Sequence, residues 1–376
     1  MKKFARVCSA LLSAVIVSAG SGVSYALEVQ TLASGLNAPW AVEKVPHENT
    51  LLVTEKSGRL LRVDMSTKRI EQIALFEQVK VHGQGGLMDV ALGPDFSRTG
   101  RLFITYAKAL GNKSATTLAS AVLDRDVTPW RLRQFKELLV ASPSSDSGRH
   151  FGSRVAFDDA GHVFFSVGDR GERASAQDLN SHNGSVIRLK LDGRVPADNP
   201  FVDQTGALPE IYSYGHRNPQ GLVFHSERNQ LFAMEHGPRG GDELNLITAG
   251  TNYGWPVISY GKEYWGPFAV GEKAKAGLAQ PMMQYTPSIA PSSLAFYDHP
   301  YFESLQGRFL IGALAGQHLS SLHFSALPQR QNPATLAHTQ ERHLDQFGRR
   351  IRDLTLLNDG RIVLLSDRGE LLLVSK

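Results

Sequence analysis

The sequence predicts an all-β protein, a six-bladed β-propeller with four-stranded antiparallel blades. A unit of two short apolar strands joined by a polar turn occurs six times, in residues 37–55, 85–106, 151–169, 219–237, 291–313 and 351–369. Repeats of roughly 40 to 70 residues that contain only strands and turns are typical of propeller blades. No long segment carries the apolar periodicity of a helix, so a helical or mixed fold is disfavoured.

The second strand of each unit is the clearest, because β-branched, aliphatic and aromatic residues are concentrated there. We expect strands at residues 101–106, 162–167, 230–234, 308–311 and 361–365. Ser57-Gly58 and Arg368-Gly369 have the composition of hairpin turns. Residues 131–139, RLRQFKELL, fit a helix or an outer strand about equally well.

The two ends of the propeller sequence predict how the ring closes. An apolar strand is expected at residues 371–375, and residues 28–32 supply a short strand near the start. Pairing an N-terminal strand with the last blade removes an exposed sheet edge. The long inserts at 192–209 and 260–281 are then expected to be loops over one face, where they would shape a substrate pocket.

Residues 1–26 are predicted to be a secretory signal, which leaves 27–376 as a single propeller domain with catalytic function. The segment has a basic start and an apolar stretch at 10–19 that is too short to span a bilayer. Its style indicates bacterial export to the periplasm, and its loss removes Cys8, the only cysteine. A chain without thiols suits an oxidising compartment.

Composition also limits the partners. Removal of Lys2, Lys3 and Arg6 with the signal lowers the formal charge from +4 to +1. A nearly neutral chain offers no electrostatic reason to bind nucleic acid, and we expect neither a nucleic-acid partner nor a membrane span.

Polar residues stand just before the first strands of the repeats. In a propeller these strands line the central channel, so equivalent positions of different blades meet in space. The polar residues at these positions are Gln84, His150, Arg217, Asn218, Ser292, Arg350 and Arg352. A ring of base, amide and guanidinium groups around one opening indicates a binding or catalytic site.

His150 and Arg217 are the strongest candidates for chemistry. A histidine at a channel mouth is suited to be a general base, because its pKa is near working pH; the alternative is a buried histidine that bonds a backbone carbonyl. Arginine offers a planar set of donors for a carboxylate or a developing oxyanion; the alternative is an inter-blade ion pair. Asn218 precedes a proline and also fits an ordinary turn.

Arg350 and Arg352 alternate along a strand and are expected on the same face, which would place an anion at the channel. The alternative is pairing with Asp345, Asp353 or Asp367. Gln84 lies among glycines that permit close approach of the backbone to a ligand.

The segment EHGPRGGDE at 235–243 is a candidate cation site. A loop rich in glycine and proline can turn backbone carbonyls inward, and calcium accepts carbonyl and carboxylate oxygens in flexible geometry. The alternative is a surface turn in which Asp242 bonds the local backbone.

Several patterns are missing from the sequence. It contains no G-x-S-x-G, no H-E-x-x-H and no cysteine cluster, which argues against a serine hydrolase of that type and a zinc protease. G-x-G-x-x-G is also missing, so redox chemistry would require a cofactor other than a nicotinamide in a Rossmann domain.

Seven segments closely resemble the soluble aldose sugar dehydrogenases that depend on pyrroloquinoline quinone (PQQ), a group similar to glucose and sorbosone dehydrogenases. They are HGQGGLMDVALGPDF, RHFGSRVAF, YGHRNPQGL, EHGPRGGDELN, NYGWP, APSSLAFY and GRRIRDL, in that order. The resemblance covers essentially the whole mature chain and implies a six-bladed propeller.

The resemblance implies a periplasmic quinoprotein oxidoreductase that oxidises aldoses at the anomeric carbon to lactones and passes electrons to an external acceptor. His150 would take the hydroxyl proton as hydride moves to PQQ, and Arg217 would lie beside the reactive quinone carbonyl. The implied cofactor-binding residues are Gln84, His150, Arg217, Asn218, Ser288, Arg350 and Arg352. The backbone carbonyls of Gly237 and Pro238 would hold Ca²⁺, and Asp242, Asn252 and Tyr253 would belong to the same pocket.

The sequence departs from the family pattern at three positions. Ala315 stands where the family has a lysine that helps to bind a cofactor carboxylate, a loss that could weaken binding by on the order of 1–3 kcal/mol. Arg350 and Arg352 could suffice without it, or Gln317 or His318 could reach into the site. Arg149 stands where the glucose-specialised branch has a carboxylate, which favours the broader aldose branch. Arg170 replaces an amide and would add positive charge near the cofactor.

Two other classes of function stay open from the residues alone. A calcium-dependent propeller hydrolase such as a lactonase would require several carboxylates directed onto the metal, whereas the inner positions here are mostly Arg, Asn, Gln and His. A non-catalytic sugar-binding propeller is compatible with alanine at position 315.

Overall fold

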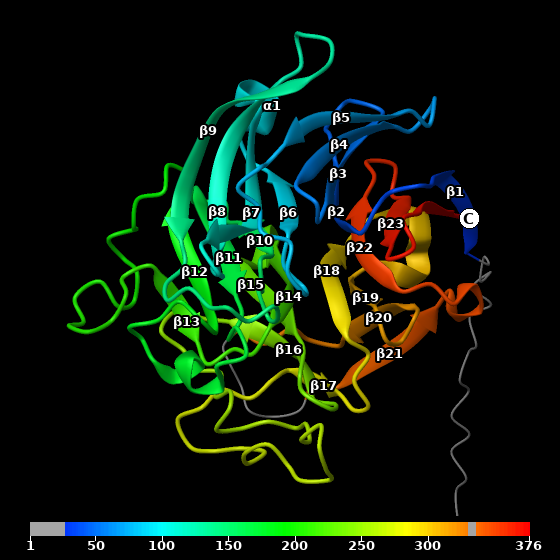
Figure 1. Cartoon of the computed structure of the whole chain (residues 1–376). Helices are drawn as coiled ribbons and strands as arrows, with labels where there is room; N and C mark the ends of the chain where they lie inside the picture. Colours follow the sequence, from blue (N-terminus) through cyan, green and yellow to red (C-terminus); the bar gives the residue numbers. More distant parts are fainter. Residues whose placement is uncertain (1–26, 330–335) are drawn as a thin grey trace, which may run out of the picture.

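The computed structural model describes residues 27–329 and 336–376, and the expected secretory signal lies outside them. Six four-stranded antiparallel sheets are arranged as blades around a common axis (Figure 1), which confirms the predicted six-bladed propeller. Each blade consists of strands that follow one another in the chain, except the last, which also contains β1.

The strands of the first three blades are as follows. Blade 1 contains β2 (Pro39–Lys44), β3 (Thr50–Glu55), β4 (Arg59–Asp64) and β5 (Ile70–Leu75). Blade 2 contains β6 (Leu87–Leu92), β7 (Arg101–Leu110), β8 (Lys113–Asp124) and β9 (Arg131–Val140). Blade 3 contains β10 (Val155–Phe157), β11 (His162–Val167), β12 (Ser185–Lys190) and β13 (Ile211–Tyr214).

The other three blades follow the same plan. Blade 4 contains β14 (Pro219–His225), β15 (Gln230–Glu235), β16 (Asp242–Ile247) and β17 (Met283–Tyr285). Blade 5 contains β18 (Pro291–Tyr297), β19 (Arg308–Ala313), β20 (Leu319–Phe324) and β21 (His338–His343). Blade 6 contains β22 (Ile351–Leu356), β23 (Ile362–Ser366), β24 (Leu371–Ser375) and β1 (Glu28–Ala33).

Helices are few and short. Within the described residues they are α1 (Phe96–Thr99) and the 3₁₀ turns η1 (Arg173–Gln177), η2 (Ser226–Arg228), η3 (Pro300–Leu305) and η4 (Asp345–Phe347). None of them has the length and apolar character required to cross a bilayer. The ambiguous segment at 131–139 belongs to β9, so the outer-strand interpretation is correct and the helix is wrong.

The ring closes by strand pairing between the two ends of the chain. β1 pairs antiparallel with β24, with Glu28 opposite Ser375 and Gln30 opposite Leu373. This is the predicted closure, and it covers the outer edge of β24. The inserts at 192–209 and 260–281 contain no strand and connect β12 to β13 and β16 to β17.

The first strands of the blades form the wall of the channel. β2, β6, β10, β14, β18 and β22 contact one another in sequence, and β22 returns to β2. In five of these strands the register shifts within the first residues, as between Pro219 and Gly221 and between Ile351 and Asp353. Such bulges re-aim side chains, and here they lie where the chain enters the channel.

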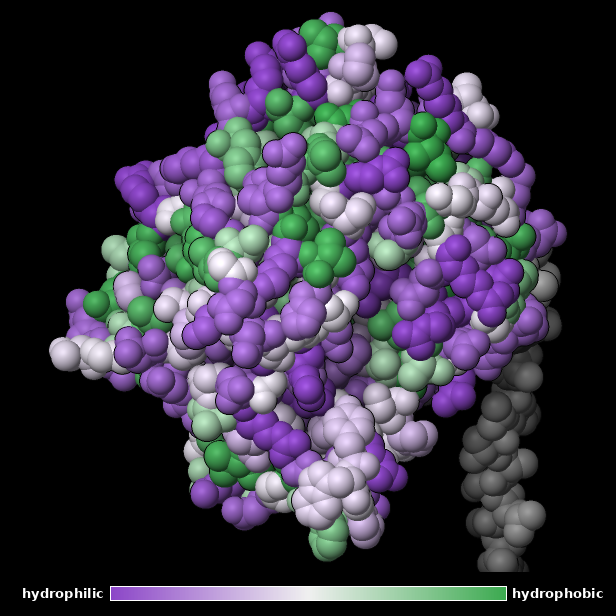
Figure 2. All heavy atoms as spheres, in the orientation of Figure 1, coloured by the Kyte–Doolittle hydropathy of each residue, from purple (hydrophilic) through white to green (hydrophobic). Residues whose placement is uncertain are grey.

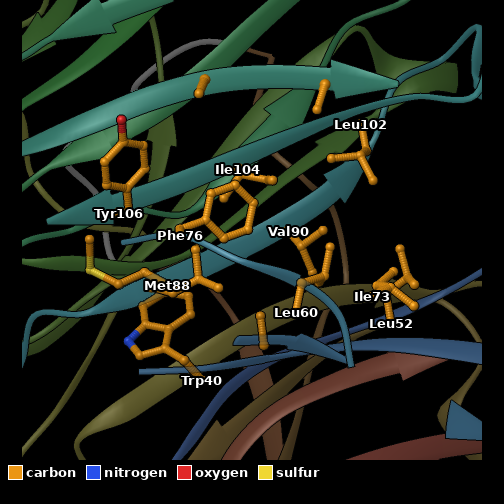
Figure 3. Packing of buried hydrophobic residues seen from close by; sticks show 14 of the residues in the cluster. Trp40, Leu52, Leu60, Ile73, Phe76, Met88, Val90, Leu102, Ile104 and Tyr106 are labelled. Atoms are coloured by element: carbon orange, nitrogen blue, oxygen red, sulfur yellow. The ribbon is translucent and has the colours of Figure 1, made fainter. Parts of the chain in front are cut away.

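The apolar core lies between neighbouring blades. Figure 3 shows the contact of blades 1 and 2, where Trp40, Leu60, Met88 and Ile104 from four strands pack together, each at most 3% exposed. Burying a side chain of this size contributes about 1.5–3 kcal/mol. The outer surface is different: Figure 2 shows a mostly hydrophilic face on which apolar groups are scattered.

Candidate active site

A cavity of about 560 Å³ lies at the mouth of the channel, where the first strands begin. Every blade contributes to its wall. The lining residues are Ala38, Pro39, Trp40, Lys56, Gly83, Gln84, Met88, Phe151, Asn218, Gln220, His236, Ala290, Leu314, Arg350, Arg352 and Asp367. The structure therefore brings Gln84, Asn218, Arg350 and Arg352 to one cavity, while their role toward a cofactor stays a prediction.

Cations outnumber anions in this wall. Lys56, Arg350 and Arg352 face a single carboxylate, Asp367, which accepts a 2.8 Å hydrogen bond from Nε of Arg350. Arg352 donates to Oε1 of Gln220 at 2.7 Å, and its Nε is buried with no partner among the described residues. Burial and the charges of neighbouring arginines lower the pKa of Arg352 to about 10, so it stays charged at neutral pH. The cavity suits an anionic ligand.

His150 is paired with a carboxylate that the sequence did not reveal. Its Nδ1 lies 2.6 Å from Oδ1 of Asp169, and its side chain is 12% exposed. Because an ionised carboxylate only accepts hydrogen bonds, Nδ1 carries the proton and Nε2 keeps its lone pair. Burial and the charge of Arg217 lower the pKa of His150, despite the opposing hydrogen bond with Asp169. The ring is therefore neutral near pH 7, as a general base requires.

Asp169 is itself held in place by two further donors. The carboxylate is fully buried and accepts hydrogen bonds from the backbone N–H of Gly171 at 2.7 Å and from Nε1 of Trp255 at 2.8 Å. Burial alone would raise the pKa of Asp169, but hydrogen bonding to His150 and the nearby positive charges lower it. Asp169 stays ionised and fixes the orientation of the histidine ring.

The loop before β10 holds His150 in a left-handed conformation, with φ of 53°. Such a conformation is unfavourable for a residue other than glycine and requires support. The backbone N–H of His150 donates to Oε1 of Gln84 at 2.7 Å. The guanidinium of Arg170 also supports this loop, because it donates to the carbonyls of Ser147 and Arg149. Its central carbon lies 3.4 Å from the ring centroid of Phe151.

Arg170 is only 1% exposed and does not line the large cavity. Its guanidinium stacks on Phe151, which lines the cavity, so the expectation that it adds positive charge near the cofactor stays a prediction. Its two Nη groups donate to loop carbonyls and thereby support the loop of His150. Arg149 is exposed, and the carbons of its side chain lie beside Gly171.

Arg217 lies beside the loop of Gly237. Its Nη1 donates to the carbonyls of His236 and Gly237 at 3.1 and 2.8 Å, and its guanidinium carbon lies 5.3 Å from the ring of Trp255. It lines a void of about 10 Å³ that shares His236 with the large cavity. Nε of Arg217 is buried without a partner among the described residues, so this guanidinium has a donor to spare for a ligand.

The predicted calcium carbonyls already accept hydrogen bonds. Arg217 donates to the carbonyl of Gly237, and the hydroxyl of Tyr264 donates to that of Pro238 at 2.8 Å. A carbonyl oxygen has two lone pairs, so each keeps one for a cation. Within the described ranges no three His, Cys, Asp or Glu side chains are grouped to hold a metal. A cation here would therefore depend on backbone carbonyls and water for most of its ligands.

Asp242 supports this loop from behind. It is fully buried and accepts hydrogen bonds from the N–H groups of Gly237, Ile289 and Ala290 and from the hydroxyl of Ser288. Burial raises the pKa of Asp242 to about 6. This is the local backbone bonding that the sequence left open as the alternative, and neither Asp242 nor Ser288 lines the large cavity.

Asn252 and Tyr253 do not line the large cavity either. The amide of Asn252 pairs with that of Gln177, with Nδ2 donating to Oε1 at 2.7 Å. Tyr253 stacks on His216 with the ring centroids 4.5 Å apart, donates to the carbonyl of Leu246, and lines only the small void. Both residues shape the turn that presents Trp255 to Asp169.

Arg154 joins blade 3 to the five other blades and lines a separate cavity of about 120 Å³. From its place before β10 it donates to Asp89 of blade 2 at 3.1 Å and to Asp353 of blade 6 at 3.0 Å. It also donates to the carbonyls of Gln220 in blade 4 and Ser292 in blade 5, and its guanidinium carbon lies 4.3 Å from the ring of Trp40 in blade 1. Ser292, which the sequence analysis placed in the polar ring, is therefore a buried residue with a structural role.

Sequence reasoning missed Asp169, Lys56 and Arg154. A weak signal exists for Asp169, because it comes two residues after the second strand of the same blade, in the motif GDRG. Lys56 lies in a hairpin turn and Arg154 within the FGSR segment, and neither has a pattern that separates it from an ordinary surface residue.

The fold and the cavity define a class of protein: a six-bladed propeller with a cationic cavity at the channel mouth and a His150–Asp169 pair next to it, joined to the cavity wall through Gln84. The chain belongs to the Glucose / Sorbosone dehydrogenase family, whose sequence profile matches residues 36–373. This confirms the resemblance found in the sequence.

Individual relatives agree with the family. The chain is 36% identical over 355 residues to the aldose sugar dehydrogenase YliI of Escherichia coli (strain K12), with 93% of each protein covered. A crystal structure of a glucose dehydrogenase is 38% identical, has a TM-score of 0.85, and is matched over 93% of this chain and 99% of that one. The PQQ-bound form of an aldose sugar dehydrogenase from Streptomyces coelicolor is 26% identical, with a TM-score of 0.75 and coverage of 93% and 97%.

Proposed function

We propose that this protein is a periplasmic quinoprotein that depends on PQQ and Ca²⁺ and oxidises aldose sugars at the anomeric carbon to lactones. An external acceptor would take the electrons. The observation that carries the proposal is the cationic cavity beside the His150–Asp169 pair, in a chain of the Glucose / Sorbosone dehydrogenase family.

The cavity fits the cofactor in size and charge. Its volume of about 560 Å³ lies within the usual range of roughly 300–1,000 Å³ for small-molecule sites. PQQ carries three carboxylates, and Lys56, Arg350 and Arg352 offer three cations against the one carboxylate of Asp367. Nε of Arg352, which lines this cavity, is buried without an acceptor among the described residues and could donate to the cofactor.

The protein residues would then have distinct tasks. Bound PQQ supplies the two-electron acceptor for sugar oxidation. Nε2 of His150 takes the proton of the anomeric hydroxyl, and Asp169 stabilises the imidazolium that forms. Arg217 presents positive charge where negative charge develops. Gln84, Asn218, Arg350 and Arg352 are proposed to contact the cofactor, with Ser288 acting through its hydrogen bond to Asp242, and the carbonyls of Gly237 and Pro238 to hold Ca²⁺.

The distribution of carboxylates favours this proposal over a hydrolase. Asp89 and Asp353 in the channel are paired with Arg154 and line a separate cavity of about 120 Å³. The carboxylates that do lie beside the loop of Gly237 are already engaged: Glu235 bonds His216 and the N–H of Arg217, and Asp242 accepts from Ser288 and backbone N–H groups. Burial raises the pKa of Glu243 to about 8, which favours its neutral form. A sugar-binding protein without catalysis remains an outcome of the experiment below.

The test uses purified protein treated with chelator and then supplied with PQQ, Ca²⁺, or both. Reduction of an artificial dye is followed with a panel of aldoses, and lactone formation is confirmed by chromatography. Turnover that requires both additions is the expected result. PQQ binding without any dye reduction would leave a binding protein, and failure to bind PQQ in a titration would overturn the proposal.

A further inference from the structure

The family lysine at position 315 has no replacement in blade 5. Ala315 is exposed, and its N–H donates to the carbonyl of Ile289 at 3.0 Å. Gln317 is also exposed, and Nδ1 of His318 bonds the carbonyl of Gly316. Blade 5 contributes only Ala290 and Leu314 to the cavity, so the suggestion that Gln317 or His318 reaches in is wrong.

Blade 1 provides a cation in the same cavity. Lys56 lies in the hairpin turn between β3 and β4, lines the cavity together with Arg350 and Arg352, and is half-buried. Its Nζ donates to the carbonyl of Gly83 at 2.6 Å, at the start of the segment that carries Gln84. An ammonium has three donors, so this contact leaves two for a ligand.

The backbone of Lys56 is fixed from both sides. Its N–H donates to the carbonyl of Ala38, and its own carbonyl accepts from the N–H of Leu87, both at 3.1 Å. Gly86 packs directly on it, since a Cβ at Gly86 would come within 2.5 Å of the Lys56 carbonyl. The lysine is therefore anchored between blades 1 and 2 before any ligand arrives, which reduces the entropy lost on binding.

The charges around Lys56 favour an incoming anion. Burial and the positive charge of Arg352 lower the pKa of Lys56, while the negative charge of Asp367 opposes this change. Asp367 is shared with Arg350, with which it forms the 2.8 Å ion pair. Lys56, Arg350 and Arg352 are thus balanced by a single carboxylate, that of Asp367. A further carboxylate from a ligand would reduce the repulsion among the three cations.

We propose that Lys56 binds a carboxylate of the cofactor and supplies, from blade 1, the charge that the family lysine supplies from blade 5. The inference rests on the proposed function. It names a residue that lies more than 250 positions away in the chain from Ala315 and that reaches the same cavity only through the closure of the propeller.

The test is a titration of the cofactor-free protein with PQQ, followed by quenching of tryptophan fluorescence, which does not depend on catalysis. Losing a charge-assisted contact is expected to raise the Kd of Lys56→Met about 10- to 100-fold. Lys68→Met is the matched control, because Lys68 is an exposed lysine in the β4–β5 turn outside the cavity, and its Kd should equal that of the wild type.

A second variant, Lys56→Gln, keeps the test decisive if Lys56→Met is unstable, because the amide can still donate to the carbonyl of Gly83 and only the charge is lost. Its Kd should rise about as much as that of Lys56→Met, whereas a purely structural role of Lys56 predicts a Kd close to that of the wild type. A Kd for Lys56→Met equal to that of the wild type would overturn this inference alone. Absence of PQQ binding by the wild type would overturn the proposed function together with it.

Discussion

The substitution Asp169→Asn isolates the base in the proposed site, because it changes charge and hydrogen bonding with little change in shape. The carboxylate accepts three hydrogen bonds: from Nδ1 of His150 and the N–H of Gly171 on one oxygen, and from Nε1 of Trp255 on the other. An asparagine has one accepting oxygen in place of two. Whichever way the amide is turned, one buried donor loses its acceptor, which costs about 1–3 kcal/mol of folding stability.

The catalytic cost follows from the tautomer of His150. When the amide NH₂ faces the ring, Nδ1 must accept, the proton moves to Nε2, and the base is lost. When the amide oxygen faces the ring, the tautomer survives, but the charge that stabilises the imidazolium is gone. General-base catalysis typically contributes a factor of about 10²–10⁴, so we expect kcat to fall by this factor, equivalent to about 2.7–5.4 kcal/mol of barrier.

The assay is dye reduction at saturating PQQ and Ca²⁺, together with the fluorescence titration of PQQ and thermal unfolding. Affinity for PQQ should change little, since Asp169 does not line the large cavity. Asp146→Asn is the matched control, an exposed aspartate four residues before His150. A kcat of the Asp169→Asn variant within three-fold of the wild type, with intact folding, would refute the role of the pair.

Three further predictions test other parts of the structure. Arg154→Met leaves Asp89 and Asp353 buried without their cation, so the free energy of unfolding in urea should fall by about 3–5 kcal/mol; a loss below 1 kcal/mol would show that Arg154 does not hold the blades together. In Gly237→Ala the new Cβ would meet backbone oxygens at 2.2–2.3 Å, so the loop must shift and the Ca²⁺ concentration for half-maximal activity should rise at least ten-fold; an unchanged value would place Ca²⁺ elsewhere. Because the pKa of His150 is lowered and its neutral form is the base, the acid limb of kcat/KM should lie below pH 6.5, with activity present above the pKa of His150 and lost below it; a limb above pH 6.5 would contradict this.

The blades could be predicted from the sequence because the alternation of apolar strands and polar turns is a local pattern. Two residues per period and a glycine-containing turn specify a blade without reference to the rest of the chain, and six copies specify the ring. From the ring alone, the meeting of Gln84, Asn218, Arg350 and Arg352 could be expected, because equivalent positions of blades converge.

Side-chain partners could not be read in the same way. Asp169 pairs with His150 because two loops of one blade converge, and Trp255 reaches Asp169 from the loop that follows β16, 86 residues along the chain. The sequence left open whether Asp242 faces a ligand or the local backbone, because this depends on loop geometry; the structure shows it accepting hydrogen bonds from the backbone. A one-residue bulge at the start of a strand is sufficient to change which side chain faces the channel.

The sequence by itself determined the propeller, the closure of its ring, the family and the end of the channel at which polar groups gather, since each of these depends on repeated local patterns. Only the tertiary structure decided how charge is arranged in the cavity. Lys56 lies near Arg352 although nearly 300 residues separate them, and Arg154 touches every blade. Distances between side chains on different blades are set by the curvature and packing of the whole ring, which no local segment encodes.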